Sequence, residues 1–290
     1  MDWPNATIQL RNYARLMRLH RPIGALLLLW PVLWALWIAA GGVPHTDVLL
    51  VFVLGTIGMR SAGCVINDYV DRNFDGFVPR TKDRPMAAGS VSRKEALIVF
   101  SVLLFGCALL VAQMNDLTIR LAFVGAALAI IYPFMKRFTY LPQIFLGLAF
   151  GWGIPMAFAA QTGQVPNIAW ALMATAVLWA LIYDTQYAMV DREDDIKIGL
   201  KSTAILFDDA DRSFIGAFQI MMIISLTMIG RQAELQWPYC VALVICMSLA
   251  LYQQKLIRQR NPGQCFKAFL NNNWYGAAVF VGIAGSYMLE

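Results

Sequence analysis

Five polar side chains occur at spacings suited to binding a divalent cation. Asn67, Asp71 and Asp75 are spaced i, i+4, i+8 and would share one face of a helix. Asp191 and Asp195 repeat the i, i+4 spacing. Carboxylates four residues apart repel each other, and magnesium relieves this while keeping positions for water and phosphate oxygens. We therefore predict that these five residues bind magnesium, with the four aspartates as the catalytic set.

The pattern Val-Asp-Arg-x-x-Asp occurs twice, at 70–75 and, 120 residues later, at 190–195. The first copy follows the second predicted membrane span and the second copy follows the sixth. Because both of these spans are even-numbered, the two copies are expected on the same side of the membrane. Paired internal elements that meet at one site recur in membrane proteins. The alternative is that both copies are ordinary solvated acidic loops, and the repeat favours the metal site over that alternative.

A basic stretch follows each acidic motif. Acidic residues followed by basic ones are expected at a metal-bridged diphosphate, because the remaining phosphate oxygens accept hydrogen bonds from Lys and Arg. For each basic residue alone, the excess of Lys and Arg in cytoplasmic loops is at least as good an explanation. As a group they are assigned to diphosphate binding: Arg72, Arg80, Arg84, Lys197 and Lys201.

The apolar content of the chain predicts a polytopic membrane protein. Of 290 residues, 59% are hydrophobic and only 14% are charged, whereas soluble domains carry about 25% charged residues. Since a helix of roughly 20 apolar residues crosses a bilayer, we predict an all-α fold with nine transmembrane helices, at about 23–40, 48–66, 96–112, 117–135, 141–160, 168–190, 213–230, 237–253 and 273–289.

The basic residues support this topology. Of the 23 Lys and Arg, 20 fall in the N-terminal tail or in the loops after the second, fourth, sixth and eighth spans. Cytoplasmic loops carry such an excess, so we predict a cytoplasmic N-terminus and an external C-terminus. Residues 7–20 of the tail are either an amphipathic helix on the membrane surface or an ordinary positive flank.

Two other features concern the spans themselves. Arg60 is embedded in an apolar segment and is expected to face a cavity, where it would contact a carboxylate or phosphate together with Arg18 and Arg21. The five cysteines show no CxxC spacing. We interpret them as small apolar residues rather than as a disulfide framework or a zinc site.

The acidic motifs resemble those of the UbiA superfamily of intramembrane prenyltransferases. The family motif NDxxDxxxD reads Asn67-Asp68-x-x-Asp71-x-x-x-Asp75 here, and DxxxD reads Asp191-x-x-x-Asp195. Tyr132-Pro133-Phe134-Met135-Lys136 resembles the family's YxxxK, and Arg80-Thr81…Arg84-Pro85 resembles its RTxxRP. Further stretches are similar to the branch that prenylates 4-hydroxybenzoate: Gly24–Pro31, Asp184–Asp191, Lys201–Ala204, Phe266–Phe269 and Asn271–Asn273.

This resemblance implies a single domain over residues 1–290, with helices around a central cavity and cytoplasmic cap loops at about 67–95 and 191–212. It implies transfer of a polyprenyl group from polyprenyl diphosphate to the ring carbon ortho to the hydroxyl of 4-hydroxybenzoate, in ubiquinone biosynthesis. Two magnesium ions would bridge the diphosphate. The protein would lie in the bacterial inner membrane, in contact with lipid and not nucleic acid, with its site open to the cytoplasm.

The resemblance also extends the set of site residues. Lys136 joins the diphosphate group, and the aromatic substrate is assigned to Arg60, Tyr132, Arg137, Asp184 and Tyr187. Lys136 and Arg137 suit either diphosphate or a benzoate carboxylate. For Asp184, metal binding, action on the phenol and a structural hydrogen bond all stay open.

Two alternative functions stay open as well. One is prenylation of another acceptor, such as a haem, homogentisate or dihydroxynaphthoate. The other is a cation-coupled transporter, because intramembrane charges and internal repeats are also typical of that class. Transporter sites usually lie near the bilayer midplane, whereas these carboxylates cluster at predicted helix ends, which favours the enzyme.

Overall fold

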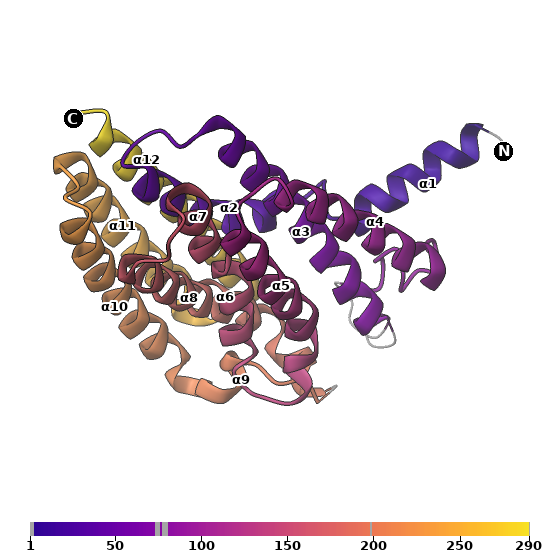
Figure 1. The fold of residues 1–290 in the computed structure, drawn as a ribbon. Coiled ribbons are helices and arrows are strands. Elements are labelled where there is room, and N and C mark those ends of the chain that lie inside the picture. Colours follow the sequence, from indigo (N-terminus) through magenta and orange to yellow (C-terminus); the bar gives the residue numbers. More distant parts are fainter. Residues whose placement is uncertain (1–2, 73–75, 77–80, 198, 290) are drawn as a thin grey trace.

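Helices make up almost all of this computed structural model (Figure 1). The structure describes residues 3–72, 76, 81–197 and 199–289, and no strand occurs among them. The all-α prediction is confirmed for these residues. The helices are α1 (Trp3–Leu16), α2 (Ile23–Ala40), α3 (Thr46–Asp71), α4 (Arg93–Val111), α5 (Asp116–Ile131), η2 (Tyr132–Arg137), α6 (Pro142–Gly151), α7 (Gly153–Thr162), α8 (Asn167–Lys197), α9 (Thr203–Phe207), η3 (Asp208–Ala210), α10 (Asp211–Gln232), α11 (Trp237–Leu256), η4 (Ile257–Gln259) and α12 (Pro262–Tyr287).

Eight segments in the described part of the chain are long and apolar enough to cross a bilayer. They match the first eight predicted spans, so the chain is a multi-pass membrane protein. α12 is not among the eight, although its 26 residues exceed the length that a span needs. Three consecutive asparagines, Asn271–Asn273, lower its hydropathy. Nine spans and a cytoplasmic N-terminus therefore stay predictions.

Three helices extend beyond the approximate spans predicted for them. α3 continues to Asp71 and α8 to Lys197, so both acidic motifs begin on the last turns of helices. α12 begins at Pro262, well before the predicted start at 273. Hydropathy locates the part of a helix that lies in hydrocarbon. It does not detect polar turns that project beyond the bilayer or that find partners inside the protein.

α8 is the central helix of the bundle, and it packs against α6, α10 and α12 (Figure 1). Trp179 of α8 also contacts Trp34 of α2, with ring centroids 5.2 Å apart and both side chains almost fully buried. Gly276 of α12 allows this close packing, because a Cβ there would lie 2.4 Å from Trp30 and 2.7 Å from Trp179. The position of α8 is thus fixed from several sides.

α4 presents an apolar surface to the outside of the bundle. Ala96 is its one buried residue, and its exposed side chains include Val102 and Phe105, at 64% and 65%. Apolar side chains on the outer surface are what contact with lipid requires. This composition agrees with a helix that packs on α3 along one side and contacts lipid along the rest.

The N-terminal tail forms a helix, which agrees with the first of the two alternatives for residues 7–20, and this helix, α1, spans Trp3–Leu16. Leu16 is fully buried against Val65 and Val91. The Tyr13 hydroxyl donates a 2.7 Å hydrogen bond to Glu95 at the start of α4, and this bond raises the pKa of Tyr13 above its ordinary value. The contacts hold the C-terminal half of α1 against the bundle. Its location on a membrane surface stays a prediction.

Replacing Gly276 by Ala should destabilise the bundle, because the new methyl group would overlap two tryptophan rings. Overpacking of this kind costs about 1–3 kcal/mol, and the thermal unfolding midpoint in detergent should fall. Gly55→Ala is the matched control, since no atom lies within 4 Å of a Cβ at that position. Equal midpoints for the two variants would contradict this account of the helix packing.

Candidate active site

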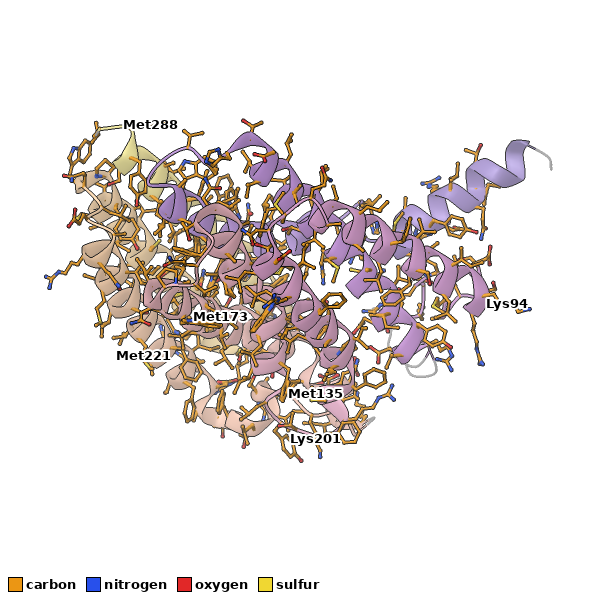
Figure 2. The ribbon with its side chains drawn as sticks, viewed as in Figure 1. Lys94, Met135, Met173, Lys201, Met221 and Met288 are labelled. Carbon is orange, nitrogen blue, oxygen red and sulfur yellow. The ribbon has the colours of Figure 1, made fainter. Side chains whose placement is uncertain are left out.

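A cavity of about 550 Å³ lies at one end of the bundle and is lined by residues of α2, α3, η2, α6, α8 and α12. The turn between α1 and α2 contributes Arg18, His20 and Arg21 to its wall. Lys201 and Met135 lie at this end of the molecule in Figure 2, whereas Met288, near the C-terminus, lies at the opposite end. The cavity therefore opens beside the helix ends that carry the acidic motifs.

Both acidic motifs contribute to this one cavity. Asn67 and Asp71 reach it from the last turns of α3, and Asp191 and Asp195 reach it from the last turns of α8. The structure therefore brings together four of the five residues assigned to magnesium. The fifth, Asp75, lies outside the described residues, as does Arg80 of the diphosphate set.

Asp71 is deeply buried at 3% exposure and is neutralised by basic side chains from η2. Lys136 forms an ion pair with its Oδ2, and the Arg137 guanidinium lies 3.8 Å from its Oδ1. That Oδ1 atom is buried and accepts no hydrogen bond from the residues that the structure describes. A buried carboxylate is tolerated only when its charge is compensated, so this ion pair determines how the end of α3 meets η2.

Asp68, one turn before Arg72, is paired as well. Its Oδ1 lies 2.8 Å from Arg18 and 3.3 Å from Arg84, and its side chain is 1% exposed. Burial lowers the pKa of Arg18, and the negative charge of Asp68 opposes that effect. Asp68 thus connects α3 to the turn after α1 and to the segment after residue 80. These contacts favour a structural role for Asp68.

The residues present suit a divalent cation, although they do not form a complete metal site by themselves. In the part of the chain that is described, no three His, Cys, Asp or Glu side chains lie close enough together to hold one ion. The buried Oδ1 of Asp71 has no hydrogen-bond partner among the described residues, and Asp191 and Asp195 line the same cavity as Asp71. Carboxylate and amide oxygens are the donors that magnesium takes when phosphate supplies the rest.

The predicted diphosphate-binding residues divide into two groups. Arg84, Lys136 and Lys201 line the cavity, and the Lys201 N–H donates a 3.0 Å hydrogen bond to the Lys136 carbonyl, which joins the segment after α8 to η2. Arg72 instead lies over the Tyr69 ring at 4.7 Å, and Lys197 pairs with Asp194 at 3.1 Å. Neither of these two residues lines the cavity.

The part of the cavity within the bundle holds the residues assigned to the aromatic substrate. Arg60, Tyr132, Asp184 and Tyr187 all line it. The Arg60 guanidinium lies 5.6 Å from the Phe150 ring centroid and against Gly24, where a Cβ would come within 2.4 Å of Nη2. Arg137 is the exception, since it donates a 2.9 Å hydrogen bond to the Val70 carbonyl and lies outside the cavity lining.

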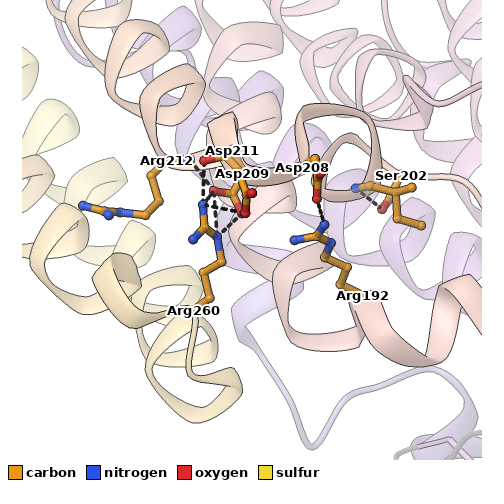
Figure 3. A network of polar contacts seen from close by, with 8 residues as sticks. Arg192, Ser202, Asp208, Asp209, Asp211, Arg212 and Arg260 are labelled. Carbon is orange, nitrogen blue, oxygen red and sulfur yellow. Dashed lines mark hydrogen bonds and ion pairs between the residues drawn. The ribbon is translucent and has the colours of Figure 1, made fainter.

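A group of ion pairs beside the cavity holds the segment that follows α8 (Figure 3). Arg192, directly after Asp191, pairs with Asp208. Arg260 donates three hydrogen bonds to the fully buried Asp211, at 3.1, 3.0 and 2.9 Å, and these raise the pKa of Arg260 above its ordinary value. The first pair attaches the end of α8 to η3, and the second attaches the turn before α12 to the start of α10.

A family model described as the UbiA prenyltransferase family matches residues 28–277. The chain belongs to the UbiA prenyltransferase family. The match covers the helices that line the cavity, apart from α1, which contributes Arg15, and parts of α2 and α12. The family resemblance that the two acidic motifs carried is therefore confirmed.

Curated relatives of this UbiA family member match over almost the whole chain. A protein of Methylococcus capsulatus named 4-hydroxybenzoate octaprenyltransferase is 59% identical over 95% of this chain and 94% of its own. A protein of Coxiella burnetii with the same name is 50% identical over 98% of this chain and 99% of its own.

Solved structures of UbiA homologues share the fold. The homologue from Aeropyrum pernix K1 superposes with a TM-score of 0.79 at 20% identity, over 89% of this chain and 96% of that one. A homologue from Archaeoglobus fulgidus bound to GPP and Mg²⁺ gives 0.74 at 20% identity, over 96% and 100%. At this identity the likeness shows the fold, and the fold prediction is confirmed.

Several cavity residues were not predicted from the sequence of this UbiA family member. Gln143 of α6 lines the cavity, and its Oε1 accepts a 3.2 Å hydrogen bond from the Thr203 backbone N–H. Phe266 and Phe269 of α12 pack on Tyr187. Burial, followed by neighbouring arginine charges, lowers the pKa of His20 at the cavity wall, which favours the neutral ring. The Phe residues lie in a stretch that resembles the family, which was a usable signal. Gln143 has no such signal.

Gly24→Ala should fold normally but displace the Arg60 guanidinium, because the new Cβ would lie 2.4 Å from Nη2 at the flexible end of that side chain. If Arg60 contacts the acceptor, the KM for the acceptor should rise about tenfold, as expected for a lost charged hydrogen bond. Gly63 also lines the cavity, and no atom lies within 4 Å of a Cβ at that position, so Gly63→Ala serves as the control. An unchanged KM in Gly24→Ala would remove Arg60 from the acceptor site.

Proposed function

We propose that this protein transfers a polyprenyl group from polyprenyl diphosphate to 4-hydroxybenzoate, at the ring carbon ortho to the hydroxyl, as a step of ubiquinone biosynthesis. The observation that carries the proposal is that two acidic motifs from distant parts of the chain line one cavity together with Arg84, Lys136 and Lys201. The choice of substrates is supported by relatives at 50–59% identity that are named 4-hydroxybenzoate octaprenyltransferase.

The acidic residues on α3 and α8 are the candidates to hold magnesium. Support comes from the buried Oδ1 of Asp71, which accepts no hydrogen bond within the described part of the chain, and from the Archaeoglobus homologue solved with GPP and Mg²⁺. Bound magnesium would neutralise the diphosphate and make it a better leaving group. Two ions are the number we propose, with Asn67 and Asp71 on one side and Asp191 and Asp195 on the other; Asp75 would complete the first group.

The basic residues would stabilise the charge that develops on the departing diphosphate. Lys136 is paired with Asp71 in this structure, and it would turn toward phosphate oxygens when these enter the cavity. Arg84 and Lys201 would donate further charge-assisted hydrogen bonds. The carbon–oxygen bond then breaks with its electron pair on diphosphate and leaves an allylic cation. The ring carbon of 4-hydroxybenzoate attacks this cation, and the ring loses its proton to regain aromaticity.

Arg60 is the best supported partner for the benzoate carboxylate. Its guanidinium lies inside the bundle, against Phe150 and Gly24, and lines the cavity. Arg137 is less well supported, because it lies outside the cavity lining and donates to the Val70 carbonyl. Tyr132, Asp184 and Tyr187 lie on the same cavity and would surround the ring. An enclosed site excludes the water that would otherwise trap the allylic cation.

The location follows from the same proposal. The bacterial relatives suggest the inner membrane, and the basic loops predict that the cavity opens toward the cytoplasm. The polyprenyl chain would extend from the cavity into lipid. A site at a helix end is accessible both to a water-soluble benzoate and to a diphosphate head group at the membrane surface.

Purified protein with magnesium, 4-hydroxybenzoate and labelled polyprenyl diphosphate should yield prenylated hydroxybenzoate. Asp71→Asn and Asp191→Asn should each lower kcat at least about 100-fold, the scale of losing a group that stabilises developing charge. Asp47→Asn, at the far end of α3 and exposed, is the control and should retain activity. Removing magnesium with a chelator should abolish turnover, and adding it back should restore turnover.

Two results would overturn this proposal. If the protein prenylates another acceptor in good yield and leaves 4-hydroxybenzoate unchanged, the acceptor is wrong. If both aspartate variants retain activity, the magnesium site is wrong.

A further inference from the structure

Buried side-chain amides form a continuous group between four helices. Gln186 of α8, Gln253 of α11 and Asn272 of α12 are fully buried, and Gln219 of α10 is 5% exposed. None of them lines the cavity. We call this group the amide chain, and with its two outer members it comprises Gln186, Gln219, Gln253, Gln254, Asn271 and Asn272.

The hydrogen bonds of the amide chain run in one direction from donor to acceptor. The Trp179 indole N–H donates to Asn272 Oδ1 at 3.0 Å, and Asn272 Nδ2 donates to Gln186 Oε1 at 2.8 Å. Gln186 Nε2 donates to Gln253 Oε1 at 3.1 Å. Gln253 Nε2 in turn donates to Asn271 Oδ1 at 3.0 Å. Asn272, Gln186 and Gln253 each accept one bond of this series through the amide oxygen and donate the next through the amide nitrogen.

A second branch meets the first at Gln253. Gln254 Nε2 donates to Gln219 Oε1 at 3.0 Å, and Gln219 Nε2 donates to Gln253 Oε1, also at 3.0 Å. Gln253 Oε1 therefore accepts from both α8 and α10. Because these amides are buried among apolar side chains, a change in helix position that separates one pair leaves polar groups unsatisfied. Apolar packing alone penalises a small rotation far less, which is why buried amides can fix register between helices.

Gln186 lies on the opposite side of α8 from the cavity. With 3.6 residues per turn, it points about 140° away from Asp191 and about 160° away from Asp184, and both of those residues line the cavity. A rotation of α8 that broke the bonds of Gln186 would therefore swing Asp191 along the cavity wall. Gln186 of the amide chain and the acidic residues of the second motif thus lie on opposite faces of the same helix, α8.

The two motif helices have largely different neighbours, although α2 and α7 contact both of them. α3 packs mainly on α4 and α2, whereas α8 packs on α6, α10 and α12. The amide chain belongs entirely to the second group. The placement of Asp191 relative to Asp71 therefore depends on how α8 is held by α10, α11 and α12.

We propose that Gln186, Gln253 and Asn272 are positioning residues for the prenyl-transfer reaction: they fix the rotation of α8, and through it the separation between the α8 and α3 carboxylates that a metal-bound diphosphate must bridge. This inference rests on the proposed function for its kinetic consequence. Its structural consequence, a fixed distance between the two motif helices, can be measured without turnover.

The test compares Gln186→Met and Gln253→Met with Gln113→Met. Methionine keeps the length of the side chain and removes the amide. Gln113 is exposed and bonds only to the Leu109 carbonyl among described partners, so it is the matched control. Spin labels on cysteines introduced at Lys94 and Glu193, both exposed, would report the distance between the start of α4, which packs on α3, and the end of α8. Cys107 and Cys240 are replaced first, because they are the accessible native thiols.

We expect a narrow distance distribution in the parent protein and in Gln113→Met, and a shifted or broadened one in the two amide variants. In turnover assays the amide variants should need about tenfold more magnesium for half-maximal rate and show about tenfold lower kcat. The double variant should lose no more than the worse single variant, because the residues act as one unit. Gln254→Met, at the outer end of the amide chain, should fold most readily and show an effect of about threefold.

Unchanged distances and magnesium dependence in all three amide variants, together with lower unfolding temperatures, would overturn the proposal, since the amide chain would then only stabilise the bundle. If the parent protein fails to prenylate 4-hydroxybenzoate, the proposed function fails, while the distance measurement still decides whether the amide chain sets the position of α8.

Discussion

Compensation of buried negative charge is the constraint on which the site depends. Asp68 and Asp71 lie one turn apart at the end of α3 and are 1% and 3% exposed. Carboxylates at such depth require cationic partners, and the chain supplies these from separate segments: Arg18, Arg84 and Lys136. The turn after α1, the segment after residue 80 and η2 all converge on α3 for this reason. The cavity wall is a consequence of that charge balance.

The two copies of Val-Asp-Arg-x-x-Asp are alike in sequence and differ in their surroundings. Arg72 of the first copy lies over the Tyr69 ring of its own helix, whereas Arg192 of the second pairs with Asp208 beyond α9. The charge of the first motif is compensated by basic residues from other segments, and the second motif is attached to η3 by its own arginine. The repeat therefore supplies similar carboxylates from two helices with largely different partners, which suits binding one diphosphate from two sides.

The sequence predicted those parts of the molecule that depend on local periodicity. Apolar length predicted eight spans that the structure describes, and the i, i+4 spacing predicted that Asp191 and Asp195 share a face of one helix. The sequence did not predict features that are determined by contacts between distant segments. Lys197 follows an acidic motif and was assigned to diphosphate, yet its nearest partner is Asp194 on the same helix. Gln143 reaches the cavity from α6, and no spacing in the sequence relates it to the site. Arg18 and Arg21, which were expected beside Arg60, do line the cavity.

The early start of α12 shows that a polar residue in a membrane protein can be fully buried, so hydropathy alone does not predict burial. Asn271 and Asn272 lower the apolar content of that helix, so a hydropathy criterion begins the span after them. In the structure, Asn272 is fully buried and exchanges hydrogen bonds with Trp179 and Gln186. Within a bilayer, polar side chains are stable where each one meets another, and such pairs are specific because lipid offers them no alternative partner. The residues that hydropathy counts against a span are thus the ones that tie α12 to α8, and α8 carries the second half of the site.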